Sequence, residues 1–158
     1  MLGRRVSVAL LPAAIAALVG CGSQGGSSQT VELGSVPLVD GAKIVVQSRQ
    51  CDRGANAYCA LEAVVVDPRF PSSEELVKGE QLLLKTRRWS TVDGYTGEQT
   101  AAESPGHKLR LTYATAYGDL KGIDLVWFQR PRAIALALSR AMFDRDSAMS
   151  LTLEAGPS

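Results

Sequence analysis

The sequence predicts an α+β fold: a small single domain in which antiparallel β-hairpins pack with one or two helices. Two pairs of β-rich runs are each joined by a short segment of turn-forming residues, as hairpins are. Other stretches carry apolar residues at helical spacing. The chain has 158 residues, of which 46% are hydrophobic, which is enough for one domain with a single core.

The first hairpin is predicted from residues 43–49 (KIVVQSR) and 58–66 (YCALEAVVV). Valine and isoleucine favour strands, and the segment between the two runs contains Gly and Asn, which favour turns. Asp67-Pro68 follows the second run. Because proline lacks the N–H that a strand ladder needs, we expect the second strand to end there.

A helix is predicted to begin at residues 71–75 and to end near Arg88. Ser72, with Glu75 three positions later, fits a capping box. An apolar stripe follows at helical spacing, formed by Leu76, Val77, Leu83 and Leu84. We expect Trp89 to cap the core where this helix ends.

The second hairpin is predicted from residues 98–103 and 108–117, which flank a Ser-Pro-Gly-His turn. In the second run, apolar Leu109, Leu111 and Tyr113 alternate with polar Lys108, Arg110 and Thr112. Alternate residues of a strand point to opposite faces, so one face of this strand is expected to be apolar and the other polar.

Residues 118–122 are predicted as a turn that leads into the apolar run at 123–128. Residues 131–143 fit two structures, because their apolar positions match both a helical and an alternating spacing. The alanines among them, and Pro131 at the first turn, favour a helix. Residues 149–153 (MSLTL) are predicted as the last strand.

The first 21 residues have the pattern of a targeting segment. Arg4 and Arg5 precede an apolar run over residues 6–19, and no acidic residue occurs before Glu32. As a helix this run would be about 21 Å long, shorter than the roughly 30 Å of a bilayer's hydrocarbon core. A transmembrane helix is therefore disfavoured. The run closes on Leu18-Val19-Gly20-Cys21.

This motif resembles the lipobox of bacterial prolipoproteins, in which a small residue precedes the lipidated cysteine. The resemblance implies that residues 1–20 are a signal peptide and that Cys21 carries the acyl chains, typically palmitate. The protein would then be held on the extracytoplasmic face of the cell membrane, since two or more chains anchor stably. A plain cleaved secretory signal is the alternative. Cys21 and the Gly/Ser-rich residues up to 30 form a flexible tether, which leaves 31–158 as the domain.

With Cys21 assigned to lipid, Cys51 and Cys59 remain. An isolated cysteine pair in an exported chain predicts a disulfide. The spacing differs from the C-x-x-C of redox-active pairs. A metal site would need further ligands, and His107 is the only histidine. We therefore expect a structural disulfide, with no metal and no cofactor.

Charge and motifs disfavour several classes of function. The chain has 17 Lys and Arg against 16 Asp and Glu, and this balance, with the expected location, disfavours a nucleic-acid partner. A serine hydrolase would need His107 beside a nucleophile and an acid. Ser104 is close in sequence, but no G-x-S-x-G motif surrounds it. We expect His107 to be an exposed turn residue, and no pair of acids is singled out by its spacing.

The best local candidate for a binding surface is Trp127-Phe128 with Arg130 and Arg132. Aromatic rings beside arginines suit contacts with proteins, carbohydrates or membrane interfaces, although core packing would also explain the two rings. The sequence thus predicts an envelope protein that is a non-catalytic binding or accessory module, with a protein or polysaccharide partner. An envelope hydrolase using acids that the sequence does not identify is the alternative, and a purely structural component is the third hypothesis.

Overall fold

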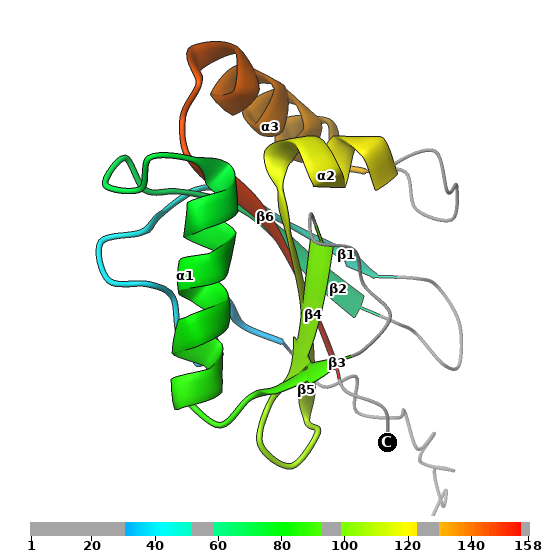
Figure 1. Ribbon diagram of the computed structural model, residues 1–158. Coiled ribbons are helices and arrows are strands. Elements are labelled where there is room, and N and C mark those ends of the chain that lie inside the picture. Colours follow the sequence, from blue (N-terminus) through cyan, green and yellow to red (C-terminus); the bar gives the residue numbers. More distant parts are fainter. Residues whose placement is uncertain (1–30, 52–58, 93–98, 123–129, 156–158) are drawn as a thin grey trace, which may run out of the picture.

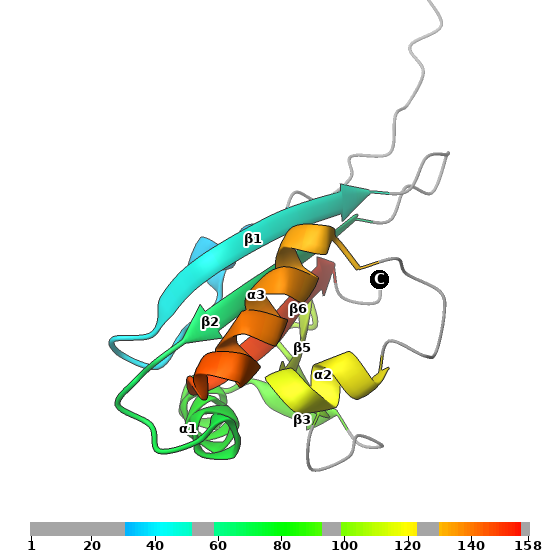
Figure 2. The same cartoon turned by 90° about the horizontal axis from the view of Figure 1, so that it is seen from above.

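The computed structural model of the chain describes residues 31–51, 59–92, 99–122 and 130–155, and it confirms the predicted α+β class. The signal peptide and tether predicted for residues 1–30 lie outside the described residues. One β-sheet forms the centre of the molecule, with helices on both of its faces (Figures 1 and 2). Within the described part of the chain, no helix combines the length and the apolar character needed to cross a membrane.

The sheet contains six strands in the order β1-β2-β6-β5-β4-β3, and every neighbouring pair is antiparallel. The strands are β1 (Lys43–Cys51), β2 (Cys59–Val66), β3 (Ser90–Val92), β4 (Gln99–Glu103), β5 (Leu109–Thr115) and β6 (Ala148–Ala155). Both predicted hairpins are present, as the β1/β2 and β4/β5 pairs. The last strand, β6, inserts between them and pairs with β2 and β5, so it joins the two hairpins into one sheet.

The helices are α1 (Ser73–Thr86), α2 (Ala116–Gly122) and α3 (Arg132–Asp144), with a 3-10 turn, η1 (Leu33–Ser35), near the start of the described chain. Helix α1 covers one face of the sheet, and α2 and α3 lie together on the other (Figures 1 and 2). We call these the α1 face and the α3 face. Because helices cover both faces, β2 is buried on both sides, which explains its nearly continuous apolar sequence.

The α1 face holds the larger core. Strand residues such as Leu111, Tyr113 and Leu151 pack there with Leu76 and Leu84 of α1. The other strand, helix and N-terminal members of this core include Leu61, Val65, Val77, Met149, Leu153, Val31, Leu33 and Val36. Leu111 and Tyr113 lie in this core, as their predicted alternation requires.

The predicted ends of α1 are also confirmed. The Ser72 Oγ accepts a hydrogen bond from the Glu75 N–H at 3.3 Å, which satisfies one of the free donors of the first turn. At the other end, the Trp89 N–H donates to the Leu84 carbonyl at 2.9 Å. The Trp89 side chain is buried in the core.

Residues 132–144 form helix α3, so the helical alternative holds for this segment. Ile134, Leu138 and Ala141 are its buried residues, at the spacing of one helical face. Pro131 lies at the N-cap, one position before the helix. The predicted turn at 118–122 is wrong, because these residues belong to α2. There Ala116 and Leu120 pack against the core beneath α3, and this tertiary packing outweighs the two glycines.

Cys51 and Cys59 form the predicted disulfide. They are the last pair in the β1/β2 register, and their Cα atoms are 4.1 Å apart. The bond therefore closes the hairpin at the end where the two strands leave the sheet, and it constrains the separation of the strands in the unfolded chain.

Candidate functional site

A small cavity opens on the α3 face of the sheet, with a volume of about 210 Å³. We call it the acid–arginine pocket; its lining residues are Ala60, Glu62, Gln99, Thr112, Arg130, Thr152 and Glu154. Its floor follows from strand register, because Glu62 lies opposite Thr152 and Thr152 lies opposite Thr112. These three polar side chains share one face of three adjacent strands.

Arg130, just before α3, forms an ion pair with Asp119 of α2. Arg130 Nη2 donates to Asp119 Oδ1 at 2.8 Å, and Nη1 pairs with Oδ2. Such two-point pairing fixes a guanidinium more firmly than a single bond does. The Asp119 side chain is only 7% exposed, and it lies behind Arg130, outside the cavity lining.

Glu62 of β2 is the second acid of the cluster, and its two oxygens differ. Gln50 Nε2 donates to Oε1 at 3.2 Å. Oε2 lies 3.7 Å from Arg130 Nη1 and accepts no hydrogen bond from the residues that the structure describes. The Glu62 side chain is 8% exposed. One oxygen of a buried carboxyl group therefore lacks a described donor at the wall of a cavity, where a bound molecule could supply one.

Burial dominates the ionisation of both acids. It raises the pKa of Glu62, an effect that Arg130 opposes and that the charge of Asp119 reinforces. Burial also raises the pKa of Asp119, against the charge of Arg130 and hydrogen bonds from Ser150 and Arg130. Two buried carboxyl groups thus share one guanidinium. Acids whose pKa is raised beside a cavity are typical of functional sites.

Of the four residues that the sequence predicts as a binding surface, the structure places one in the pocket. Trp127 and Phe128 lie outside the described residues. Arg130 is 17% exposed and belongs to the pocket, whereas Arg132, the first residue of α3, is exposed. Arg130 is therefore in the site as the partner of buried acids.

Sequence reasoning missed Glu62 and Asp119. A signal for Glu62 was present, since it is the one charged residue in the strand CALEAVVV, and a charge in a strand buried on both faces needs a partner. Asp119 carried no such signal, because its Gly-Asp context is typical of turns.

His107 is the exposed turn residue that the sequence predicts. It adopts a positive φ of 55°, and its Nδ1 lies 2.5 Å from Glu103 Oε2. The Oγ of Ser104 accepts a hydrogen bond from the Leu109 N–H at 2.9 Å. This serine therefore stabilises the β4/β5 turn, and the two residues show no nucleophile–base contact.

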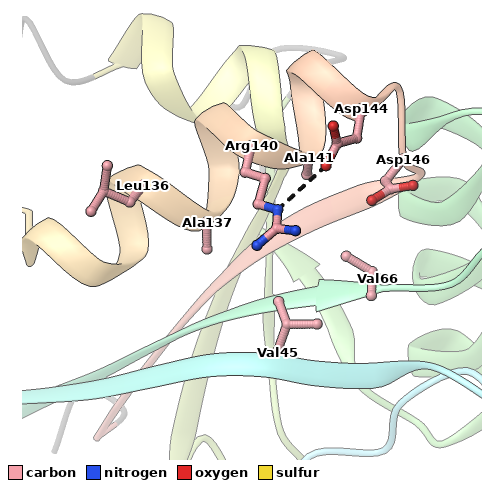
Figure 3. A pocket seen from close by; sticks show the side chains of 8 residues that line it. All are labelled: Val45, Val66, Leu136, Ala137, Arg140, Ala141, Asp144 and Asp146. Atoms are coloured by element: carbon pink, nitrogen blue, oxygen red, sulfur yellow. Dashed lines mark hydrogen bonds and ion pairs between the residues drawn. The ribbon is translucent and has the colours of Figure 1, made fainter.

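A second hollow, of about 440 Å³, lies between α3 and the edge strand β1 (Figure 3). Its lining residues are Val45, Val66, Leu136, Ala137, Arg140, Ala141, Asp144 and Asp146. Val45 lies where the β1/β2 register shifts, as in a β-bulge. The Arg140–Asp144 pair, with Nε and Oδ2 3.4 Å apart, is at the surface, where ion pairs contribute little. This α3–β1 groove contains no buried charge.

A third buried acid, Glu80 of α1, lies in the core of the α1 face. Its Oε2 accepts a hydrogen bond from the Val39 N–H at 3.0 Å, and burial raises its pKa to about 7. Glu80 lines none of the hollows described above. It connects α1 to the segment that precedes β1, which is a structural role.

The acid–arginine pocket is thus the candidate functional site, since it alone of the described hollows combines a cavity with buried acids and hydroxyl groups. In the described part of the chain, no three His, Cys, Asp or Glu residues lie close enough to hold a metal ion. Comparison of the chain with protein-family models, with curated proteins and with solved structures gives no match.

Proposed function

We propose that this chain is a lipid-anchored protein of the bacterial cell envelope whose domain is a non-catalytic binding module. The acyl chains at Cys21 hold it on the extracytoplasmic face of the membrane. The acid–arginine pocket is its ligand site. The observation that carries the binding role is the Glu62 Oε2 oxygen, which is buried at the cavity wall and accepts no hydrogen bond from any described residue.

Two features support the location. The first is the n-region, apolar run and lipobox ending at Cys21. The second is the Cys51–Cys59 disulfide, because such bonds persist in oxidising compartments outside the cytoplasm. The Gly/Ser-rich residues 22–30 supply a tether with a typical reach of roughly 15 to 20 Å, so the pocket can meet ligands away from the lipid surface.

The size and lining of the pocket support a binding role. About 210 Å³ is less than drug-sized ligand sites occupy, so the ligand is one small polar molecule or one unit of a larger one. Gln99, Thr112 and Thr152 offer hydrogen bonds to such a ligand.

The hydrolase alternative has one observation in its favour, the two acids with a raised pKa. A mechanism with paired carboxylates needs both to reach the substrate. Asp119 is held by Arg130 and does not line the cavity. Only Glu62 of this pair faces the pocket, so the two acids with a raised pKa do not form a catalytic pair there.

The anchor is tested by replacing Cys21 with Ser, labelling cells with palmitate and separating membrane from soluble fractions. We expect the wild-type chain to carry label and sediment with membranes. The Cys21→Ser chain should lose the label. Label on this variant, or a wild-type chain without label, would contradict the anchor.

The binding role is tested by native mass spectrometry of the full-length protein purified from its own membranes in detergent. We expect a small molecule to be retained by the wild-type chain. Thr112→Met, which fills the pocket without changing charge, should lose it. Thr91→Met, on the exposed edge strand β3, is the matched control and should keep it. Equal retention by Thr112→Met and wild type would exclude the pocket as the site.

A further inference from the structure

Arg130 does not contact the two acids of the acid–arginine pocket equally. Both terminal nitrogens of Arg130 engage Asp119, while its distance to Glu62 Oε2 is 3.7 Å. The guanidinium is thus largely used by one of its two acids. Glu62 is left facing the cavity with a charge that no described donor contacts at Oε2. Glu62 therefore has only a distant guanidinium as counter-charge, and its free oxygen is placed to accept from a cationic group of a ligand.

The groups around Glu62 indicate the form of that cation. Glu154 lines the same cavity and adds a second carboxylate, and the Thr112 and Thr152 hydroxyl groups add neutral oxygen acceptors. A primary ammonium group has three N–H donors and a compact charge. Its three donors match in number two carboxylates and one hydroxyl group of this lining.

The cationic residue of the pocket, Arg130, also has an unsatisfied atom. Arg130 Nε is buried and donates to no acceptor within the described part of the chain, although Arg130 lines the pocket. An oxygen on the ligand would satisfy it. Together with the amide of Gln99 and the two hydroxyl groups, this indicates a ligand that carries hydroxyl oxygens as well as an amine.

We propose that the acid–arginine pocket binds a small hydroxylated primary amine of the amino-sugar class, with its ammonium group between Glu62 and Glu154. This inference rests on the proposed function, because it names the ligand class of the same site. A planar guanidinium is broader than an ammonium group. In the described part of the chain, no group of three His, Cys, Asp or Glu residues is placed to hold a metal ion. An anion would face two carboxylates.

The experiment compares three sugars that differ at one position: D-glucosamine, D-glucose and N-acetyl-D-glucosamine. Binding to the full-length protein in detergent is measured by calorimetry at about pH 6.5, below the pKa expected for an amine of this kind. We expect D-glucosamine to bind and to raise Tm, and the two uncharged sugars to bind at least about tenfold more weakly, the equivalent of one charge interaction of about 1.4 kcal/mol. Equal binding of glucose and glucosamine would overturn the proposal.

The key variant is Glu62→Gln, which removes the charge and keeps the shape of the side chain. We expect it to weaken glucosamine binding at least about tenfold and to leave Tm unchanged or higher, because the variant removes a buried charge whose Oε2 oxygen accepts no hydrogen bond from the described residues. Glu32→Gln, the same change at an exposed residue, is the matched control and should alter neither quantity. A stabilising structural role for Glu62 would instead appear as a lower Tm with unchanged binding, and that result would also overturn the proposal.

A second variant, Glu154→Gln, tests the other wall of the pocket at a partly exposed position. It should also weaken binding, so the proposal stays testable even where Glu62→Gln alters the fold. The ammonium group could come from a free amino sugar or from one residue of a polymer. Retention on immobilised glucosamine oligomers distinguishes these sources, since a free-ligand site would bind the monomer alone.

The binding experiments distinguish a wrong ligand class from the absence of any ligand. If another class of small molecule is retained in native mass spectrometry and Thr112→Met releases it, the binding module stands and the amino-sugar ligand is wrong. If no small molecule of any class binds, the binding module itself fails.

Discussion

The two faces of the sheet are built from the same strands but differ in chemistry. On the α1 face, residues such as Leu61 and Leu153 pack into a large apolar core, in which the carboxyl group of Glu80 is buried. On the α3 face, their sequence neighbours Glu62 and Thr152 line the acid–arginine pocket. Alternation along a strand separates these side chains completely, so one set of strands supports both a core and a polar site.

The α3 face also changes from apolar to polar along the strands. Val64 and Ala148 lie in the small apolar cluster with Ile134 and Leu138 of α3. Towards the other end of β2 and β6 the same face becomes polar, through Ser150 to Glu62 and Thr152. The apolar end fixes α3 on the sheet, and the polar end is available for a ligand. The comparison indicates that the α1 face stabilises the fold and that the α3 face carries the function.

The largest expected effect comes from removing the cation of the α3 face. Arg130→Met would leave Asp119 and Glu62 buried without a positive charge. Breaking a buried ion pair in this way costs about 3–5 kcal/mol, which is a large part of the stability of a small domain. Urea denaturation at neutral pH measures the loss. The loss should shrink in acid, because both carboxyl groups have a raised pKa and become neutral as the pH falls.

Arg132→Met is the matched control, since Arg132 is exposed at the start of α3. Surface changes of this kind stay within about 0.5 kcal/mol. Similar losses from the two variants would show that Arg130 does not neutralise the buried acids, and the assignment of the charged cluster would be wrong.

The next effect tests Glu80, the buried acid of helix α1. Burial raises the pKa of Glu80 to about 7 from an ordinary value of 4.5. An acid with a raised pKa in the folded state contributes stability that is fully present below pH 4.5 and is lost as the pH rises through about 7. That shift corresponds to about 3 kcal/mol. Urea denaturation across this pH window should show a smaller decline for Glu80→Gln than for the wild-type chain.

The wild-type slope has other contributors, because Glu62 and Asp119 on the α3 face shift in the same direction. The quantity to compare is therefore the difference in slope between variant and wild type. Tyr113, whose pKa burial and the charge of Glu80 raise to about 12, does not titrate in this window. Glu75→Gln, an exposed change on the same helix, should keep the wild-type slope. A Glu80→Gln chain with that same slope would contradict the assignment.

Much of the fold was predictable because its signals are local. The Ser72 N-cap, the Pro68 strand end and the Cys51–Cys59 pair each act over a few residues, and each appears in the structure as expected. The Glu75 side chain pairs with Lys78. Helix α2 was not predicted. Its Gly-Asp-Leu-Lys-Gly sequence has local turn signals, and the helix forms because α3 packs against Ala116 and Leu120.

The candidate site was only partly predictable, because its charges meet across the fold. Arg130 was identified as a candidate, but its partners come from β2 and α2, far apart in the sequence. No spacing rule joins Glu62 to Asp119. The sheet register and the position of α2 at the end of β5 bring them together, and these follow from tertiary packing, which a single sequence does not encode as a pattern.

The smallest predicted effect concerns the N-terminal ends of α1 and α3, the helices of the two faces. On the α1 face, Ser72 caps α1 with its side chain. On the α3 face, Pro131 occupies the N-cap of α3 and provides no side-chain hydrogen bond. Replacing Ser72 with Ala removes the acceptor for the Glu75 N–H, at a cost of about 1 kcal/mol. Thermal or urea denaturation measures it.

The matched control is Ser139→Ala, an exposed position within α3. There alanine has the higher helix propensity, so stability should be unchanged or slightly higher. A helix without a side-chain cap must draw its stability from packing, and for α3 that packing is the apolar cluster around Ile134 and Leu138. Ser72→Ala without a measurable loss would mean that α1 depends on packing in the same way, and the two faces would then differ only in the polar chemistry of their cores.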